Sequence, residues 1–188
     1  MNIYLIRHGE STSDVENKYG GAYDDHLTEK GRTGAVLLAE RLQGKGIEAI
    51  YCSPLLRAKE AADTVNEILN LPLAVVEELR ERDYGILNGM DKDEARATYP
   101  EIVEKHKDVH TTDLQGESYE DFKRRVLATF QAVTNGNQYN SIAIFTHGGP
   151  IKLLYRELLS MGELEGIGDY GILTLTENGG FKFAGLNT

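Results

Sequence analysis

Short apolar runs alternate with helically periodic segments along this 188-residue chain, and this alternation restricts the possible folds strongly. Before residue 150, strands are expected in four segments, 3–6, 47–52, 73–79 and 141–146. The segments between them place apolar residues three and four positions apart, the spacing of an amphipathic helix. Because alternating strands and helices form parallel sheets covered on both faces, the pattern predicts an α/β fold.

Three of the expected helices have recognisable N-terminal capping residues. Thr28 precedes the first, and Ser118 precedes the third with an acidic residue three positions later. Ser53 is followed directly by proline, an order that favours the start of the second helix at this point. A fourth helix is expected over 150–159.

The segment between the third and fourth strands is long and polar. It contains two short helical pieces around Pro100, and we expect about 83–140 to form a small helical cap insert within one domain spanning 1–188. Near the end, Asn178-Gly179 separates two strand-like runs and predicts a hairpin turn. The expected architecture is a three-layer α/β/α fold with a mostly parallel sheet and an antiparallel edge hairpin.

The charge balance excludes several classes of partner. Twenty Lys and Arg residues against 30 Asp and Glu residues give a net charge of −10. Duplex nucleic acids and anionic membranes attract basic surfaces, so neither is expected as a partner. No apolar run reaches the roughly 20 residues of a membrane helix, and Arg7 interrupts the first apolar run too early for a signal peptide. We therefore expect a cytoplasmic protein.

Charged side chains gather where the predicted strands end, which is where open α/β sheets bind ligands. The first strand runs into R-H-G-E-S at 7–11, and the fourth into T-H-G-G at 146–149. Arg57 follows the second strand and Glu81 the third. Guanidinium groups can bind phosphate oxygens in pairs, a neutral imidazole can act as a nucleophile, and a glutamate can act as a general acid. The pattern therefore predicts a site for a compact phosphate dianion.

Four motifs resemble those of the histidine phosphatase superfamily, which is phosphoglycerate mutase-like, in its branch with R-H-G-E-S. They are R-H-G-E-S at 7–11, S-P-x-x-R-A at 53–58, E-R-D-Y-G at 81–85 and T-H-G-G at 146–149. They occur in the family's order and cover nearly the whole chain. The resemblance implies a phosphatase that hydrolyses a small phosphorylated metabolite, with no metal and no cofactor.

The resemblance also implies a role for each matching position. His8 would be the nucleophile that forms a phosphohistidine, and Glu81 would protonate the leaving group and then activate water. Arg7, Arg57 and His147 would bind the phosphoryl group and stabilise its transition state. The remaining expected substrate contacts are Ser11, Asp14, Asn17, Gly21, Tyr84, Lys92 and Gly148.

Two alternatives to the phosphatase remain open. A cofactor-primed phosphoglycerate-type mutase would share these motifs, and Lys92 supports it. Such mutases hold the substrate carboxylate with an adjacent arginine pair, which the corresponding region here, around 107–110, lacks, and the insert is shorter, so the phosphatase is favoured. A non-catalytic module that binds phosphorylated ligands is suggested by Asp14, which stands where the family usually has asparagine. This carboxylate would repel a phosphate unless it is protonated, turned away or paired with a cation.

Three other residues are expected to be structural. Cys52 lies one residue too close to Arg57 for the phosphate loop of cysteine-dependent phosphatases, so we expect a buried thiol. His106 and His110 have the spacing of a zinc-binding pair, but the sequence offers no convincing third ligand. We expect both histidines on a solvated helix face.

Overall fold

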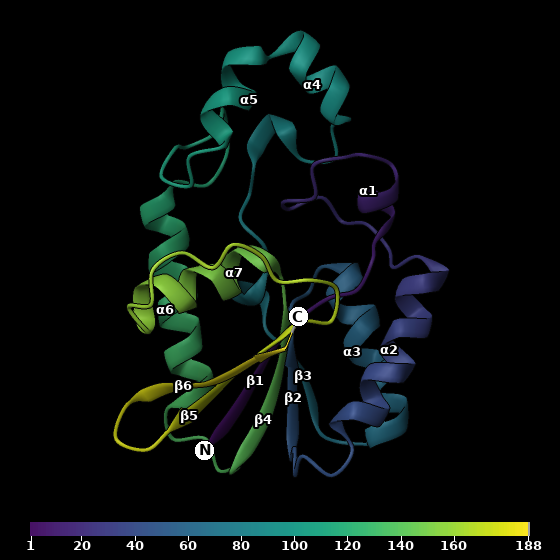
Figure 1. Cartoon of the computed structure of the whole chain (residues 1–188), viewed down its shortest axis with the longest axis vertical. Coiled ribbons are helices and arrows are strands. Elements are labelled where there is room, and N and C mark those ends of the chain that lie inside the picture. The colour runs from purple at the N-terminus through teal and green to yellow at the C-terminus, as the bar shows by residue number, and fades with distance from the viewer. Residues whose placement is uncertain (188) are drawn as a thin grey trace.

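A six-stranded sheet forms the centre of the computed structural model, which describes residues 1–187 (Figure 1). Its strands follow the order β3 (Leu73–Val75), β2 (Ala49–Cys52), β4 (Ser141–Thr146), β1 (Asn2–Arg7), β5 (Ile172–Glu177) and β6 (Phe181–Asn187). The first four are mutually parallel, whereas β5 and β6 run antiparallel to their neighbours. The predicted mostly parallel sheet with an antiparallel edge hairpin is confirmed.

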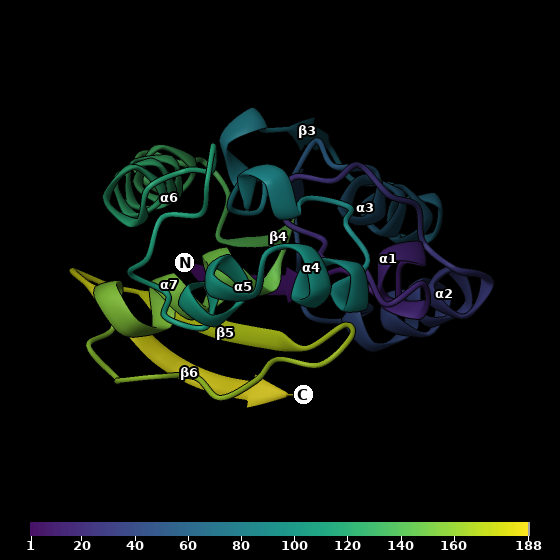
Figure 2. The same ribbon diagram turned by 90° about the horizontal axis from the view of Figure 1, so that it is seen from above.

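Helices cover both faces of the sheet and one of its ends. Helices α2 (Glu29–Leu42) and α3 (Leu56–Leu69) lie on one face, and α6 (Tyr119–Thr134) and α7 (Gly148–Leu153) on the other (Figure 1). The cap helices α4 (Lys92–Thr98) and α5 (Pro100–His106) lie beyond the carboxyl ends of the parallel strands, as Figure 2 shows from above. A short helix, α1 (Thr12–Val15), was not predicted. Within residues 1–187, no helix is both long and apolar enough to cross a bilayer.

Successive side chains along each strand point to opposite faces of the sheet, so the sheet has a hydrophobic core on each face. Ile3, Leu5 and Ile144 belong to the core beneath α6 and α7, whereas Ile6 and Phe145 belong to the core beneath α2 and α3. All five side chains are almost completely buried. Burying a side chain of this size contributes about 1.5–3 kcal/mol, so the two cores hold the strands, and the residues that follow them, in fixed positions.

Several element boundaries differ from the prediction, and three of these differences lie near the strand exits. Helix α3 begins at Leu56, after Ser53 and Pro54, and the Ser53 hydroxyl accepts from the Leu55 N–H in the turn before the helix. Strand β3 ends at Val75, and a single 3₁₀ turn follows. Helix α7 begins earlier than expected, at Gly148, so its N-terminus coincides with the T-H-G-G motif.

Cys52 ends β2 inside the core, where it is fully buried as expected. Burial raises the pKa of its thiol to about 12. A thiol of this kind remains protonated at neutral pH and is a poor nucleophile. The side chain therefore contributes packing to the sheet.

Candidate active site

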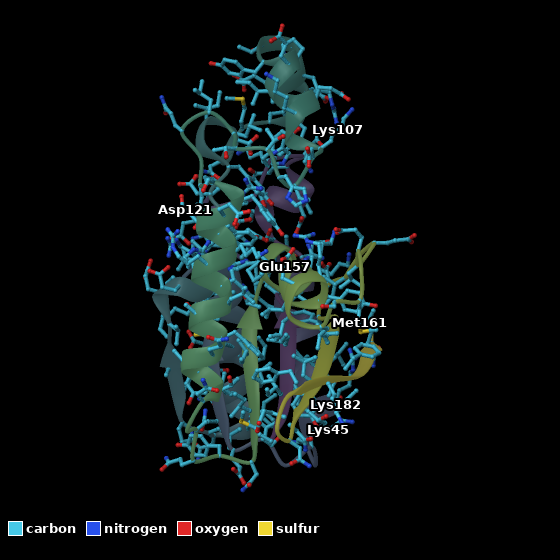
Figure 3. All side chains as sticks on the ribbon, turned by 90° about the vertical axis from the view of Figure 1, so that its left-hand side faces the viewer. Lys45, Lys107, Asp121, Glu157, Met161 and Lys182 are labelled. Carbon is cyan, nitrogen blue, oxygen red and sulfur yellow. The ribbon has the colours of Figure 1, made fainter. Side chains whose placement is uncertain are left out.

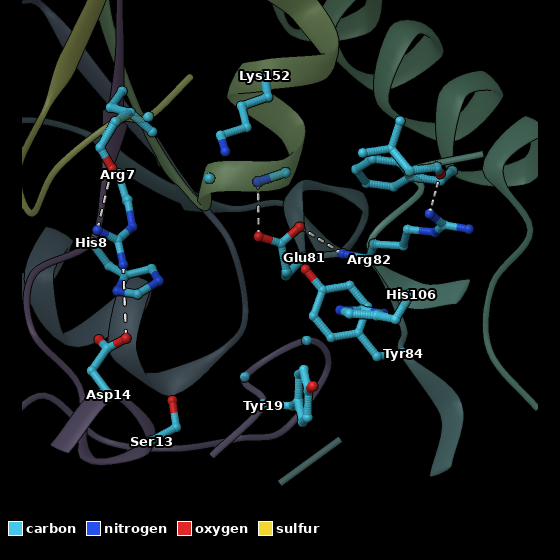
Figure 4. Close-up of a pocket in the computed structure, with 18 of the residues that line it drawn as sticks. Arg7, His8, Ser13, Asp14, Tyr19, Glu81, Arg82, Tyr84, His106 and Lys152 are labelled. Atoms are coloured by element: carbon cyan, nitrogen blue, oxygen red, sulfur yellow. Dashed lines mark hydrogen bonds and ion pairs between the residues drawn. The ribbon is translucent and has the colours of Figure 1, made fainter. Parts of the chain in front are cut away.

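The carboxyl ends of β1 and β4 lie side by side, and this brings the two motif histidines together. Arg7 is paired with Thr146 in the parallel register, so His8 and His147 are the next residues on adjacent strands. Their ring centroids are 5.1 Å apart, and both side chains are buried. All side chains are drawn in Figure 3, and Figure 4 shows the site at close range.

His8 is held in one tautomer. Its Nδ1 lies 2.7 Å from the carbonyl oxygen of Gly9, which can only accept, so Nδ1 carries the hydrogen. Its Nε2 accepts a hydrogen bond from Arg57 Nε at 3.0 Å. Burial, followed by the positive charges of Arg57 and Arg7, lowers the pKa of His8 well below its usual value. The imidazole is therefore neutral at physiological pH, with a lone pair on Nε2 that can attack an electrophile.

Arg57, on the first turn of α3, is anchored by groups from the loop after α1. Its Nη1 donates to Asp25 Oδ1 and to the Tyr23 carbonyl, both at 2.7 Å, and its Nη2 donates to the Gly21 carbonyl at 2.8 Å. Burial disfavours the charge on Asp25, but Arg57 and hydrogen bonds from Ser13 outweigh it and lower the pKa of this carboxyl. The guanidinium is thus fixed with Nε directed at His8.

The role of Asp25 was not predicted from the sequence. Asp24 and Asp25 are adjacent and chemically alike, and only the loop conformation separates them. Asp24 is exposed and accepts from the Leu56 N–H at the start of α3. Asp25 is buried and points inward to Arg57.

His147 is also fixed and neutral. Its Nε2 and the Ser53 hydroxyl are hydrogen-bonded at 2.7 Å, and the same hydroxyl oxygen accepts from the Leu55 N–H at 3.2 Å. Burial, then Arg57 and His8, lower the pKa of His147 well below its usual value. Its Nδ1 is buried and has no hydrogen-bond partner within residues 1–187. Such unsatisfied buried atoms are rare and often mark functional sites.

Glu81 is oriented by two backbone donors. Its carboxylate accepts from the Arg82 N–H and from the Gly149 N–H at the start of α7, each at 2.9 Å. A Cβ atom at position 149 would overlap this carboxylate, so a larger residue there would force Glu81 out of this orientation. The Arg82 guanidinium donates to the carbonyls of Val109, Thr111 and Glu117, which ties the loop between α5 and α6 to the residue beside Glu81.

Asp14 is paired with a cation and also caps a helix. Its Oδ2 accepts from the backbone N–H of Ser11 at 3.0 Å, and its Oδ1 lies 3.9 Å from Arg7 Nη2. Arg7 also donates from Nη1 to Asp169 at 2.8 Å. Asp14 is therefore paired with a cation, which is one of the three arrangements that would reduce its repulsion of a bound phosphate.

A cavity of about 590 Å³ opens over these groups and extends beneath the cap. The predicted site residues in its wall are Arg7, His8, Ser11, Asp14, Gly21, Arg57, Glu81, Tyr84, Lys92 and Gly148. His147 is not part of the wall but packs against His8. The Asn17 side chain lies outside the wall, where it is exposed and donates to Asp93 at 3.4 Å.

The cavity wall has the opposite charge balance to the protein as a whole. Seven lysine and arginine side chains line it, against three carboxylates, although the net charge of the chain is −10. A cavity with this excess of cations attracts small anions. Lys18, Lys152 and Arg156 belong to the wall and were not predicted from the sequence.

His106 is also in the wall, so its expected position on a solvated face is wrong. Its Nδ1 donates to Asp113 at 2.7 Å, whereas His110 is exposed and packs edge-on against Tyr119. The two histidines do not form a pair. In the described part of the chain, no three His, Cys, Asp or Glu side chains form a metal-binding cluster.

Comparisons with known proteins agree with this geometry. A model of the histidine phosphatase superfamily (branch 1) matches residues 3–176. The chain is 29% identical over 163 residues to Phosphoserine phosphatase 1 of Hydrogenobacter thermophilus. The aligned region covers 86% of this chain and 77% of the relative. It is 31% identical over 172 residues to the 2,3-bisphosphoglycerate-dependent phosphoglycerate mutase of Bartonella quintana, covering 87% and 84% of the two chains.

A solved structure supports the same assignment. YhfR of Bacillus stearothermophilus is 31% identical and superposes with a TM-score of 0.89, covering 97% of this chain and 95% of that one. The family and the type of enzyme predicted from the four motifs are thereby confirmed. The chain belongs to the histidine phosphatase superfamily, branch 1.

Proposed function

We propose that this protein hydrolyses a small phosphomonoester through a phosphohistidine on Nε2 of His8. One observation carries the proposal: a neutral His8, fixed by Gly9, presents Nε2 beside Arg57 in a cavity whose wall has more cations than carboxylates. The substrate's phosphoryl group would be bound by Arg7, Arg57 and the Gly148 amide. Burial of His147 next to His8 supports a further role for it in binding the phosphoryl group.

In the first step, the Nε2 lone pair attacks phosphorus while the bond to the leaving oxygen breaks. Arg57 must exchange its hydrogen bond to Nε2 for one to a phosphoryl oxygen. Its two Nη atoms stay anchored to Asp25 and to backbone carbonyls, so this exchange requires little movement. Protonated Glu81 gives its proton to the leaving oxygen, and an alcohol departs.

In the second step, water attacks the phosphohistidine. The Glu81 carboxylate takes a proton from this water, the N–P bond breaks, and its electron pair returns to Nε2. Nδ1 keeps its proton throughout because the Gly9 carbonyl accepts from it in every state. The products are inorganic phosphate and the starting form of the enzyme, with no metal or other cofactor in either step.

Residues 1–188 form one domain in this proposal, and helices α4 and α5 of the insert over about 83–140 cover the leaving group. We also propose that the enzyme acts in the cytoplasm, because phosphorylated metabolites are found inside cells. The predicted contacts Ser11, Asp14, Tyr84 and Lys92 would meet the substrate from the cavity wall. Asn17 would do so only after its side chain leaves Asp93.

A mutase is the second candidate, because one relative is named as a phosphoglycerate mutase and Lys92 lies in the cavity wall. A mutase must retain its bisphosphate intermediate until the second transfer. The arginine pair that would grip the substrate carboxylate is absent from the corresponding region around 107–110, so water should intercept the phosphoenzyme. Incubation with 3-phosphoglycerate separates the two activities: we expect phosphate release, and faster formation of 2-phosphoglycerate would favour the mutase.

A phosphate-release screen over a panel of phosphomonoesters, with and without EDTA, tests the proposed function. The best substrate is then prepared with ³²P and mixed briefly with the enzyme. We expect an acid-labile phosphoenzyme that is absent in His8→Ala. Normal turnover by that variant, loss of activity in EDTA, or binding without turnover across the panel would each contradict the proposal.

A further inference from the structure

His106, the last residue of α5, is fixed at the cap side of the cavity. Its Nδ1 donates to Asp113 Oδ2 at 2.7 Å. Its ring lies edge-on to Tyr19 and Tyr84, with centroids 5.2 Å and 4.6 Å away. Three contacts from three separate segments therefore determine the orientation of one imidazole.

Asp113 makes this orientation costly to change. Its side chain is 3% exposed, and its Oδ1 is buried with no hydrogen-bond partner in the described chain. If His106 rotated away, both carboxylate oxygens would be buried without a donor. A buried charge without a partner is strongly unfavourable. Asp113 therefore acts as a positioning residue for the His106 ring.

The remaining ring nitrogen, Nε2, is accessible and unpaired in the described chain. It forms no hydrogen bond within residues 1–187, and it is not among the buried atoms that lack a partner. His106 belongs to the cavity wall, and Figure 4 shows its ring beside Tyr84, across the pocket from His8. This nitrogen can thus meet the part of a substrate that extends away from the phosphoryl group.

We propose that His106, oriented by Asp113, is a specificity-determining residue that hydrogen-bonds a hydroxyl group on the leaving alcohol. The inference rests on the proposed phosphatase function and narrows its substrate class to phosphomonoesters of hydroxylated alcohols. A hydroxyl can donate to Nε2 of the neutral ring and can accept from the protonated ring, so it can form the hydrogen bond in either protonation state of His106. A simple alkyl leaving group offers neither interaction.

Matched substrates isolate this contact. Ethyl, propyl and butyl phosphate are compared with 2-hydroxyethyl, 3-hydroxypropyl and 4-hydroxybutyl phosphate by phosphate release. A neutral hydrogen bond favours the hydroxylated member by roughly two- to tenfold in kcat/KM at the chain length that reaches Nε2. Because the hydroxyl takes no part in the chemistry, we expect the preference in KM rather than in kcat.

Four variants show whether His106 carries the preference. His106→Asn keeps a polar group near Asp113 but cannot reach the former Nε2 position, so the preference should fall to about one. His106→Gln reaches further and should retain part of it. Asp113→Leu removes the anchor of the ring and should reduce the preference, whereas Asp113→Asn keeps an acceptor and should retain most of it. Lys105→Gln, an exposed position on the same helix, is the control with an unchanged preference.

The possible results distinguish a failure of the proposed role of His106 from a failure of the proposed phosphatase function. If the unmodified enzyme hydrolyses neither series nor any member of the phosphomonoester panel, the phosphatase function itself fails, whereas turnover of the panel without turnover of the hydroxylated series overturns only the role of His106. If it hydrolyses both without preference at any chain length, only the role of His106 is overturned. The same conclusion follows if His106→Asn and Asp113→Leu keep the preference, or if they lose activity equally on both members of a pair.

Discussion

The Nε of Arg57 donates a hydrogen bond to Nε2 of His8 at 3.0 Å, although both side chains are buried. The other guanidinium nitrogens are held by Asp25 and by two backbone carbonyls. One residue thereby orients the proposed nucleophile and presents a donor where the phosphoryl oxygens would arrive. Because the donor is already held in place, it needs little movement during the reaction.

Removing the charge of Asp25 should weaken phosphate binding by releasing Arg57. In Asp25→Asn, we expect KM for the best substrate to rise by about tenfold, and the stability to fall by about 2–4 kcal/mol because a buried ion pair is broken. Steady-state kinetics and urea denaturation measure the two effects. Asp24→Asn is the matched control, since its amide oxygen can still accept from Leu56. Equal effects in both variants would contradict the role of Asp25.

Replacing Glu81 should separate the two chemical steps. With p-nitrophenyl phosphate, whose leaving group needs little protonation, Glu81→Gln should form the phosphoenzyme but hydrolyse it slowly. We expect a burst of about one p-nitrophenol per enzyme molecule, followed by turnover about 10²–10⁴-fold slower than that of the unmodified enzyme. Stopped-flow absorbance records both phases. Unchanged steady-state turnover would eliminate Glu81 as the acid and base.

Gly149 should be intolerant of even one added methyl group. In Gly149→Ala, the new Cβ would displace the Glu81 carboxylate, so we expect kcat to fall by about tenfold or more while the protein remains folded. Circular dichroism checks the fold, and phosphate release measures kcat. Gly185→Ala, where a Cβ meets no atom within 4 Å, serves as the control. Full activity in Gly149→Ala would mean that the orientation of Glu81 does not matter.

Stability should fall as the solution becomes acidic, because His8 and His147 have lowered pKa values in the folded state. Below the unfolded pKa of about 6.5, the unfolded chain binds protons that the folded site does not. Each histidine then costs up to about 1.4 kcal/mol per pH unit until its folded pKa is reached.

Urea denaturation at pH 7.5, 6.5 and 5.5 measures this pH dependence. His8→Asn should lose less stability than the unmodified protein between pH 6.5 and 5.5, and His147→Asn should behave in the same way. His110→Asn, an exposed position, should leave the dependence unchanged. If all four proteins lose stability in parallel, the buried histidines are not the source of the pH dependence.

Much of this arrangement was predictable because strand ends are determined by local patterns. His8 and His147 each follow an apolar run, and parallel strands of one sheet necessarily bring such ends to one edge. Tyr84 and Glu81 could be placed from a motif in the same way. The resemblance of four motifs added the expected chemical roles, which remain predictions.

The partners of these residues were not predictable, because they lie on loops far away in the sequence. Ser53 pairs with His147 from 94 positions away, and Asp25 reaches Arg57 across 32 positions. His106 has the polar neighbours of an exposed helix residue, and only the fold of the following loop brings Asp113 against it. Periodicity and capping rules describe segments, whereas these contacts depend on how irregular segments return to the sheet.

The three hydrogen bonds from Arg82 to the loop between α5 and α6 have a consequence for the size of substrates. They join the cap to the residue next to Glu81, so lifting the cap would break them and disturb the acid at the same time. These hydrogen bonds therefore hold the cap in place over the cavity before a ligand binds. We therefore expect small leaving groups to be accommodated under the cap more readily than bulky ones.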